Sequence, residues 1–404
     1  MQVICGRIYR NGLMKACIGI EDGRIVEIKK NIHGRKTDYG DAVIMPAGID
    51  VHVHFREPGY EHKEDFFTGT KAAALAGITC VLDMPNNKPA ITTRDNFIEK
   101  VRKIKYKACV DYGLYMKGDG EEVADCIGYK IFLYDEIFCT TKKIEEVLKE
   151  LKKRGKPIAV HAEIAECIQR RKARNLKEHE RNRGMQCELK AVEKLLKINE
   201  KVNAKLHICH VTSSKSVEML NGKTSFGVTL HHLLFSYEKK LRHEAMGKVN
   251  PPLRSEEERK KLYKKFIVGK IPILESDHAP HLMKEKEKFE DAPSGMPGVD
   301  ALFPIMLYMV KKGKISLDLL YTMICENPAE FFGINKGNIK IGKDADLIVI
   351  DFGNEGKIRA LSKCGWSLYE GMPCIYPSEV YLRGEKIVEN GEFVGSSGMG
   401  RMIK

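Results

Sequence analysis

Eight short apolar segments recur through the middle of the chain and constrain its fold more than any other feature. Each is rich in β-branched or aromatic residues, which is typical of a β-strand. Most are separated by amphipathic segments of helical length. The predicted strands are 47–55, 79–85, 110–116, 128–134, 157–163, 204–212, 225–232 and 271–280, and the predicted helices include 62–76, 92–106, 141–154, 187–201 and 255–270. The short connection 117–127 gives little sign of a helix.

This alternation predicts an α/β fold, a parallel (β/α)8 TIM barrel over residues 46–334. Residues 1–45 and 335–404 do not follow it. They carry short apolar runs separated by Asn-Gly and Asp-Gly pairs, which favour tight β-hairpins. Neither end is large enough to bury a core alone, so we predict one small composite β domain, built from both chain ends, beside the barrel.

The composition indicates an ordinary globular protein, with 43% hydrophobic and 30% charged residues. No apolar run approaches the roughly 18 residues of a membrane span, and the start of the chain does not resemble a secretory signal. We therefore expect a cytoplasmic protein without a membrane segment. The 12 cysteines are scattered and form no C-x-x-C pair, so we expect buried, reduced thiols.

The net charge of +13 raises the question of a nucleic-acid partner. Most lysines, however, alternate with glutamates in helical segments, which is typical of a solvated helix face. The one dense basic segment is Gln169–Arg183. We expect no nucleic-acid partner, and a basic protein suits a small anionic substrate.

Two histidines in the stretch DVHVHFREPG (50–59) give the first sign of chemistry. His52 and His54 are two residues apart, so a strand turns both side chains to one face. If that strand belongs to the barrel, they lie near its carboxyl end, where such barrels hold their active sites. Two convergent imidazoles suit a borderline metal such as zinc.

Later predicted strands end in side chains of the same kind. His161 lies at the end of the fifth, His207 and His210 at the end of the sixth, and Asp277, His278 and His281 at the end of the eighth. Strand alternation turns His207 away from His210, so we leave His207 out of the site. In the fourth strand, Lys130 stands among apolar residues, where a free ammonium is costly to bury. A snorkelling lysine or a buried ion pair would explain it, as would a carbamate that bridges two metal ions.

Several longer motifs then agree on one family. The stretches DVHVHFREPGYEHKEDF, DMPNNKP, HAE, HICHVTS, NPPLR and SDHAPH, with GKDADLIVID near the carboxyl end, closely resemble the dihydroorotases of the metal-dependent amidohydrolase superfamily. The resemblance runs from about residue 45 to residue 330. It implies the reversible cyclisation of N-carbamoyl-L-aspartate to L-dihydroorotate in pyrimidine biosynthesis.

The resemblance also implies a site with two Zn²⁺ ions. His52, His54 and Asp277 would bind one ion, His161 and His210 the other, and carboxylated Lys130 would bridge them. Asp277 would move the proton between the attacking water and the ring nitrogen. Arg56, Asn86 and His281 match contacts to the substrate carboxylate, whereas Asn250 and the backbone at Gly295 match contacts to the ring amides. Arg56 shares the inward face of His54 and offers a fork of donors. The alternative role for Arg56 is a surface ion pair with Glu57.

Two departures from the family pattern matter. Many bacterial relatives carry an aspartate slightly further along in place of the bridging lysine, and Asp135 is near enough here to leave that alternative open. In some animal relatives a glutamate on strand seven helps to bind a third zinc. Gly227 stands at the matching position, so we expect no third metal.

Other readings stay open at this stage. An allantoinase or a hydantoinase opens similar cyclic amides, but hydantoinases lack the arginine after H-x-H, so Arg56 with Asn86 favours a dihydroorotase. A catalytically inactive relative that serves as a scaffold is the rival from another class. The same ligands suit manganese or cobalt. Homo-oligomer formation and association with other enzymes of pyrimidine synthesis are not determined by the sequence.

Overall fold

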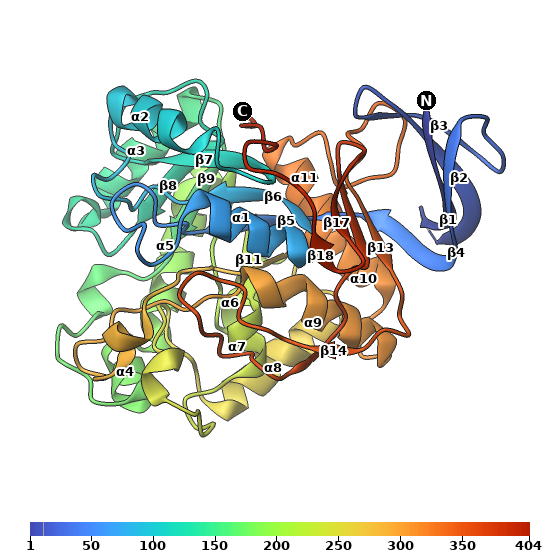
Figure 1. Ribbon diagram of the computed structural model, residues 1–404. Helices are drawn as coiled ribbons and strands as arrows, with labels where there is room; N and C mark the ends of the chain where they lie inside the picture. The colour runs from blue at the N-terminus through green and yellow to red at the C-terminus, as the bar shows by residue number, and fades with distance from the viewer. Residues whose placement is uncertain (11) are drawn as a thin grey trace.

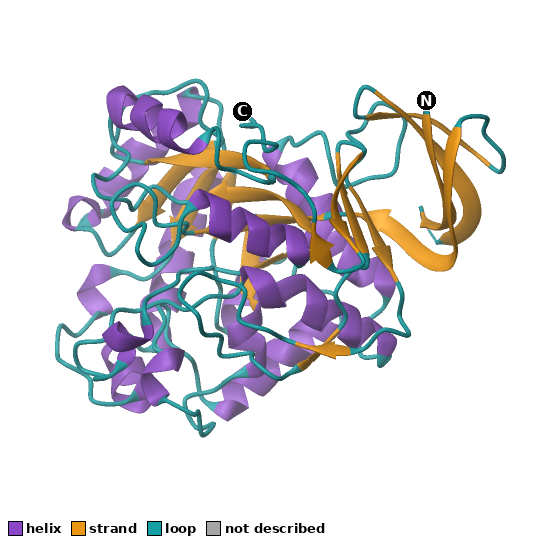
Figure 2. Cartoon of the chain, viewed as in Figure 1, coloured by secondary structure: helices purple, strands orange, loops and turns teal. Residues whose placement is uncertain are grey.

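Eight parallel strands form the centre of the molecule in the computed structural model, which describes residues 1–10 and 12–404. They follow one another around a sheet in chain order, and helices surround them (Figures 1 and 2). The strands are β5 Gly48–Val53, β6 Ile78–Asp83, β7 Asp111–Lys117, β8 Gly128–Phe132, β9 Ile158–His161, β10 Leu206–Ile208, β11 Ser225–Thr229 and β12 Ile273–Glu275.

The first and last strands of this sheet meet and nearly close it into a barrel. Val53 forms a parallel bridge with His278, and the His54 N–H donates to the His278 carbonyl at 2.8 Å. Almost every residue of the eight strands is buried. That explains why the segments read as continuous apolar runs, because both faces of a parallel sheet are covered. The TIM-barrel prediction is confirmed.

The predicted helices are present, and most of them begin at capping side chains. Thr93, Thr140 and Ser255, for example, each accept a hydrogen bond from a backbone N–H in the first helical turn. The longer helices are α1 Phe66–Leu75, α2 Arg94–Ile104, α3 Thr141–Lys153, α5 Met185–Val202, α8 Glu256–Ile267 and α9 Val299–Lys311. The shorter ones are α4 Leu176–Asn182, α6 Ser214–Leu220, α7 Leu230–Leu234, α10 Leu317–Tyr321 and α11 Asn327–Phe332. The connection 117–127 contains no helix.

The seventh strand is shorter than predicted. We expected strand over 225–232, but β11 ends at Thr229 and α7 begins at the next residue. The Thr229 side chain accepts from the His232 N–H and so caps the helix. The apolar character of this stretch comes from burial, which a helix provides as well as a strand.

Both chain ends contribute to a second sheet, which lies at the right in Figure 1. β4 of the amino-terminal part pairs with β13 of the carboxyl-terminal part, Met45 opposite Ile348. Its strands, in spatial order, are β18 Glu392–Phe393, β17 Glu385–Glu389, β16 Glu379–Leu382, β13 Leu347–Ile350, β4 Arg35–Pro46, β1 Gln2–Tyr9, β2 Leu13–Glu21 and β3 Arg24–Lys29. The composite sheet from both ends is confirmed; the short pair β14 Gly356–Lys357 and β15 Pro373–Cys374 lies apart from it.

Two-residue turns join several of these strands. Asp22 and Gly23 both have positive φ, 49° and 77°, and Asn390 and Gly391 have 51° and 75°. Two successive positive φ values define the turn that suits the twist of a hairpin. The turns predicted from the Asp-Gly pair at 22–23 and the Asn-Gly pair at 390–391 are therefore confirmed. The predicted Asn-Gly turn at 11–12 includes a residue outside the described ones.

The expectation that all cysteines are reduced is wrong for two of them. Cys5 of β1 and Cys17 of β2 form a disulfide. The two residues are direct partners across the antiparallel pair, which brings their side chains together on one face. The other ten cysteines are free. Among residues 1–10 and 12–404, no helix is both long and apolar enough to cross a membrane.

Candidate metal centre and substrate pocket

Five predicted metal ligands come together at the carboxyl ends of the barrel strands. His52 lies on β5 and His54 just beyond it, while His161 ends β9. His210 and Asp277 follow the ends of β10 and β12 by two residues each. All five side chains are at least nine-tenths buried. They line one cavity of about 100 Å³ together with Arg56, Asn86, Phe132, Tyr134, Asn250, Ala279, Ser294 and Gly295.

The first group of ligand atoms comes from His52, His54 and Asp277. Oδ1 of Asp277 lies 3.1 Å from His54 Nε2 and 3.3 Å from His52 Nε2. The two imidazole nitrogens are themselves 3.3 Å apart. These atoms all lie within 4.8 Å of one another, so a single ion could contact all three. Two nitrogens and one carboxylate oxygen form a donor set that suits zinc.

The second group comes from His161 and His210. Nδ1 of His161 lies 3.0 Å from Nε2 of His210, and their ring centroids are 4.5 Å apart. The His210 ring also faces His52 at 5.1 Å between centroids. The two groups are therefore neighbours within one buried cluster. Buried nitrogens this close are stable when a cation or a shared proton lies between them.

Outer contacts of His54, His161 and His52 indicate which nitrogen of these three rings faces the cluster. His54 Nδ1 lies 2.6 Å from Asn86 Oδ1, and His161 Nε2 lies 2.6 Å from Glu163 Oε2. His52 Nδ1 lies 3.5 Å from Glu275 Oε2. In each case the other ring nitrogen points at the cluster. Metal-binding histidines have this arrangement, because the outer partner sets the tautomer and orientation of the ring. The residues present therefore fit a metal centre.

Glu163 is a site residue whose role the sequence did not reveal. It is buried between His161 and Arg183, which lies 2.6 Å from the same Oε2. Burial by itself raises the pKa of Glu163, but Arg183 and His161 outweigh it and hold the pKa below its ordinary value. Arg183 belongs to the basic segment 169–183. Its charge thus balances that of Glu163 inside the barrel. In the sequence, Glu163 is the last residue of the HAE motif, and no role was assigned to it.

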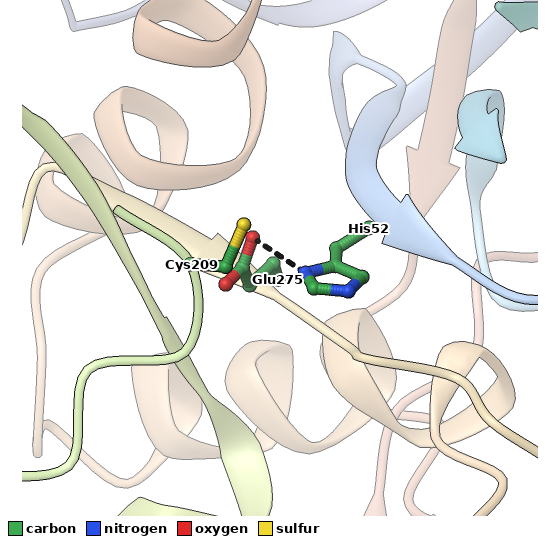
Figure 3. Close-up of side chains that lie close together, drawn as sticks. All are labelled: His52, Cys209 and Glu275. Carbon is green, nitrogen blue, oxygen red and sulfur yellow. Dashed lines mark ion pairs between the residues drawn. The ribbon is translucent and has the colours of Figure 1, made fainter. Parts of the chain in front are cut away.

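Glu275 is the second residue that sequence reasoning missed. Its carboxylate accepts from the backbone N–H of His210 and lies 3.3 Å from His207 Nε2 as well as beside His52. Figure 3 shows His52, Cys209 and Glu275 converging from three strand ends. Glu275 stands two residues before Asp277, so strand periodicity could have pointed to it.

Gly227 provides the space that Glu275 occupies. A Cβ atom added at Gly227 would lie 2.5 Å from the Glu275 carboxylate carbon. A side chain at position 227 would therefore displace the Glu275 carboxylate of the neighbouring strand. Some relatives carry a glutamate on strand seven, which is β11 here. In this protein the carboxylate beside position 227 is that of Glu275, which comes from β12.

The expectation that His207 faces away from His210 is wrong, although His207 does lie outside the residues that line the cavity. It points into the barrel toward Glu275, as Cys209 does, because the two share a strand face. The strand β10 ends at Ile208, and His210 has a φ of +39°. Alternation therefore does not extend to His210, and its ring joins the same interior from a turned backbone.

Lys130 lies beside this group on the barrel interior. Its side chain is 1% exposed, and Nζ lies 2.9 Å from Cys209 Sγ. Cys209 Sγ in turn lies within 4.8 Å of ligand atoms of His52 and Glu275. Asp135, the alternative to Lys130, points elsewhere: its carboxylate pairs with Lys117 Nζ at 3.3 Å.

Burial lowers the pKa of three of the cluster histidines, which favours their neutral form. Burial, reinforced by the charge of Lys130, lowers the pKa of His52 to about 4. Burial also lowers the pKa of His161 and, together with its histidine neighbours, holds that of His210 well below its usual range. For Asp277, burial raises the pKa, but His52 and His54 outweigh it and keep the pKa below its ordinary value. Neutral imidazoles and a carboxylate are the protonation states that bind a metal ion.

Three site residues adopt a strained backbone. Arg56, His210 and Asp277 have φ values of +65°, +39° and +45°. Left-handed conformations are costly for residues other than glycine, and they gather at functional sites. Each lies where the chain leaves a strand and must aim a side chain back over the barrel mouth.

The predicted substrate contacts lie beside the cluster. Arg56, Asn86, Asn250 and Gly295 line the cavity, and His281 lies behind Arg56 with its Nε2 3.1 Å from Arg56 Nη2. Arg56 does not pair with Glu57, which bonds Lys107 instead. At Gly295 a Cβ would lie 2.6 Å from the Ala279 carbonyl oxygen, so only glycine fits there.

A parallel barrel with histidines and an aspartate gathered at the carboxyl ends of its strands defines a metal-dependent hydrolase of the amidohydrolase type. Residues 43–372 match the family described as "Amidohydrolase family", and the chain belongs to it. Within that family its similarity is to the dihydroorotases, which confirms the resemblance drawn from the motifs. The dihydroorotase of Thermoplasma volcanium is 37% identical over 100% of this chain and 97% of its own length. That of Thermoplasma acidophilum is 37% identical over 100% and 98%.

The fold is shared with solved structures of related enzymes. The L-hydantoinase (dihydropyrimidinase) of Arthrobacter aurescens superimposes with a TM-score of 0.94, at 26% identity over 100% of this chain and 99% of that one. Dihydroorotase and hydantoinase are two of the activities that the sequence analysis considered for this protein.

Proposed function

We propose that this protein catalyses the reversible cyclisation of N-carbamoyl-L-aspartate to L-dihydroorotate. The observation that carries the proposal is the pairing of two features in one cavity. Arg56, with His281 behind it, stands beside the buried group of His52, His54 and Asp277. The first feature suits a substrate with a carboxylate, and the second suits hydrolysis of an amide. Full-length similarity to dihydroorotases supports it.

We further propose that the cluster holds two zinc ions. His52, His54 and Asp277 would hold one ion, His161 and His210 the other, and carboxylated Lys130 would bridge them. When bound, the ions would polarise the ring carbonyl and lower the pKa of the attacking water. The separation of the ligands into two adjacent groups, each oriented by outer hydrogen bonds, supports this division.

The chain's own residues would bind the substrate and move one proton. Arg56, Asn86 and His281 would hold the carboxylate through charge-assisted hydrogen bonds. The Asn250 side chain and the backbone at Gly295 would orient the ring amides. In ring opening, Asp277 would take a proton from the attacking water and deliver it to the ring nitrogen that leaves. In ring closure the same carboxylate would act in the reverse order.

Lys130 would contribute as a carbamate. The buried ammonium would first lose a proton. The neutral amine would then form an N–C bond with carbon dioxide and release a second proton, which leaves an anionic carbamate. The near-complete burial of Lys130 supports this, since an ammonium whose hydrogen-bond partner is a thiol is poorly compensated. In the Lys130→Ala variant we expect activity to disappear and to return in part with added short-chain carboxylates. Full activity without them would rule out the bridge.

Hydantoinase activity is the second candidate, and the close structural match to an L-hydantoinase favours it. The resemblance implies that hydantoinases lack the arginine after H-x-H, and their substrates carry no matching ring carboxylate. Allantoinase activity is a further alternative of the same class. A non-catalytic scaffold would not require the ordered set of ligands and outer partners found here.

Direct assay of the purified protein separates these candidates. We expect turnover of L-dihydroorotate, loss of turnover after treatment with a chelator, and recovery with zinc. Hydantoin, allantoin and dihydrouracil serve as matched substrates without the ring carboxylate, and we expect little turnover of them. Turnover of these three without turnover of L-dihydroorotate would overturn the proposal. Failure to turn over any of the four, with zinc present, would favour a scaffold. We also propose a cytoplasmic location, where the soluble substrate would be found.

A further inference from the structure

His281 lies between two cationic side chains that contact its two ring nitrogens. Nζ of Lys63 lies 3.1 Å from Nδ1, and Nη2 of Arg56 lies 3.1 Å from Nε2. His281 and Lys63 are both buried, and the backbone carbonyl of His281 accepts from Trp366 Nε1 at 2.7 Å. The ring is therefore contacted at both nitrogens, and its backbone is anchored by Trp366, before any ligand arrives.

Lys63 acts as a hydrogen-bond donor toward the ring. Its Nζ also pairs with Glu285 Oε1 at 2.7 Å, which supports the charged ammonium. An ammonium has three donors and no acceptor. The second carboxylate oxygen of Glu285 is 3.9 Å from His281 Nδ1, beyond hydrogen-bond distance. Nδ1 of His281 must then be the acceptor.

The opposite nitrogen must carry the hydrogen. Burial, together with the charge of Arg56, holds the pKa of His281 well below its ordinary value, so the ring is neutral. A neutral imidazole with an acceptor at Nδ1 has its hydrogen on Nε2. An independent contact agrees, because Nε2 lies 3.2 Å from the carbonyl oxygen of Ser294, which can only accept.

This tautomer changes the meaning of the contact between His281 and Arg56. Both Nε2–H and Nη2–H are donors, so they cannot bond each other although they are 3.1 Å apart. Arg56 is held in place by a bond from its Nε to the Pro280 carbonyl at 3.0 Å. Two donors fixed side by side at a cavity wall fit the two oxygens of one carboxylate.

We propose that Lys63 is a positioning residue: it holds His281 as the Nε2–H tautomer and so completes, with Arg56, a two-donor site for an anionic group. The identity of that group as the ring carboxylate rests on the proposed function, whereas the tautomer does not. The other tautomer would aim a lone pair at the carboxylate and repel it. Lys63 would therefore set specificity for a carboxylate without touching the substrate.

Nuclear magnetic resonance of ring-¹⁵N histidine measures the tautomer directly. Comparison with His281→Gln assigns the His281 signals. In the wild-type protein at pH 7.5 we expect a protonated Nε2 and an unprotonated Nδ1. An Nδ1–H tautomer or an imidazolium in the wild type would overturn the proposal, and this result needs no turnover.

Variants at Lys63 then test its role. We expect Lys63→Met to shift His281 toward Nδ1–H and Lys63→Arg to keep Nε2–H, because arginine is also only a donor. Lys284→Met removes an exposed lysine of the segment that carries His281 and serves as the matched control, with no expected change. An unchanged tautomer in folded Lys63→Met would overturn the role of Lys63.

Kinetics separate positioning from a general structural effect. For L-dihydroorotate we expect Lys63→Met to raise KM by about 10- to 100-fold with a smaller change in kcat, which is the effect of losing one charge-assisted hydrogen bond. Lys63→Arg should restore most of the affinity. If kcat falls as far as KM rises, the positioning role is wrong. Should the wild type fail to turn over L-dihydroorotate, the proposed function fails, and the resonance measurement still decides the tautomer.

Discussion

Oε2 of Glu163 lies 2.6 Å from Nε2 of His161, and this contact turns the other nitrogen of the ring toward His210. Arg183 contacts the same carboxylate from the other side at 2.6 Å. One buried carboxylate thereby connects the basic segment of the chain to the interior of the barrel. Its charge is balanced by Arg183, so it orients His161 without isolating a buried anion.

We predict that Glu163→Gln weakens metal binding by about 10- to 100-fold, the usual effect of losing an outer partner of a metal-binding histidine. Glutamine keeps the size of the side chain but removes the charge that makes the imidazole basic. Competition with a chromogenic chelator measures the affinity. Glu166→Gln is the matched control, because Glu166 lies on the same segment and is exposed. Equal metal affinity in the two variants would contradict this role.

A second prediction concerns the fit of Gly227 against Glu275. Gly227→Ala should lower the free energy of unfolding by about 1–3 kcal/mol, because the added methyl meets the carboxylate of a neighbouring strand in a packed interior. Adding Glu275→Ala should recover part of that loss, which a double-mutant cycle measures in denaturant. Gly184→Ala is the control, since a Cβ there meets only one atom, at 3.9 Å. Additive losses in the double variant would show that the two positions are independent.

Removal of the metal should lower thermal stability as well as activity. The buried cluster of His52, His54 and Asp277 would lose the ion that stabilises it, and an ion at 100 times its dissociation constant contributes about 2.7 kcal/mol. Calorimetry before and after dialysis against a chelator measures the change in Tm. Added zinc should restore the Tm of the wild type, and it should restore the Tm of His210→Asn to a smaller extent. A Tm unaffected by the chelator would argue against a bound metal.

The last prediction concerns acid stability and His179. Burial lowers the pKa of His179 to about 4, and its Nε2 contacts the Val249 carbonyl at 2.9 Å. The unfolded chain, with a histidine pKa of about 6.5, binds the proton first as pH falls, so the folded state loses stability between about pH 6.5 and pH 4. His179→Gln removes this proton uptake.

Denaturant unfolding at pH 7.5 and pH 5.0 measures the effect. The wild type should lose about 2 kcal/mol more than His179→Gln over this interval. Glutamine can still donate to the Val249 carbonyl, so the comparison isolates the titration from the hydrogen bond. Equal losses in both proteins would mean that His179 does not stay neutral when buried.

The sequence determined those features of the fold that depend on local patterns of residues. Strand and helix positions followed from the alternation of apolar runs with amphipathic segments, because such patterns act within a few neighbours along the chain. The same holds for the turns at Asp22 and Asn390. The motifs also identified the family and the types of side chain that meet at the barrel mouth.

Local pattern failed where a contact joins distant segments. The disulfide between Cys5 and Cys17 depends on the register of two strands, and the inward direction of His210 depends on where β10 ends. The helix after Thr229 reads as strand because burial alone makes its residues apolar.

The sequence by itself determined which chemical groups this protein carries and which strand end each one occupies. Only the tertiary structure decided how they are oriented: Glu163 against Arg183, Glu275 in the space left by Gly227, and Lys63 behind His281. The physical reason is that a hydrogen bond requires a partner within about 3 Å with the right geometry. Partners separated by tens or hundreds of residues are brought to that distance only when the barrel closes.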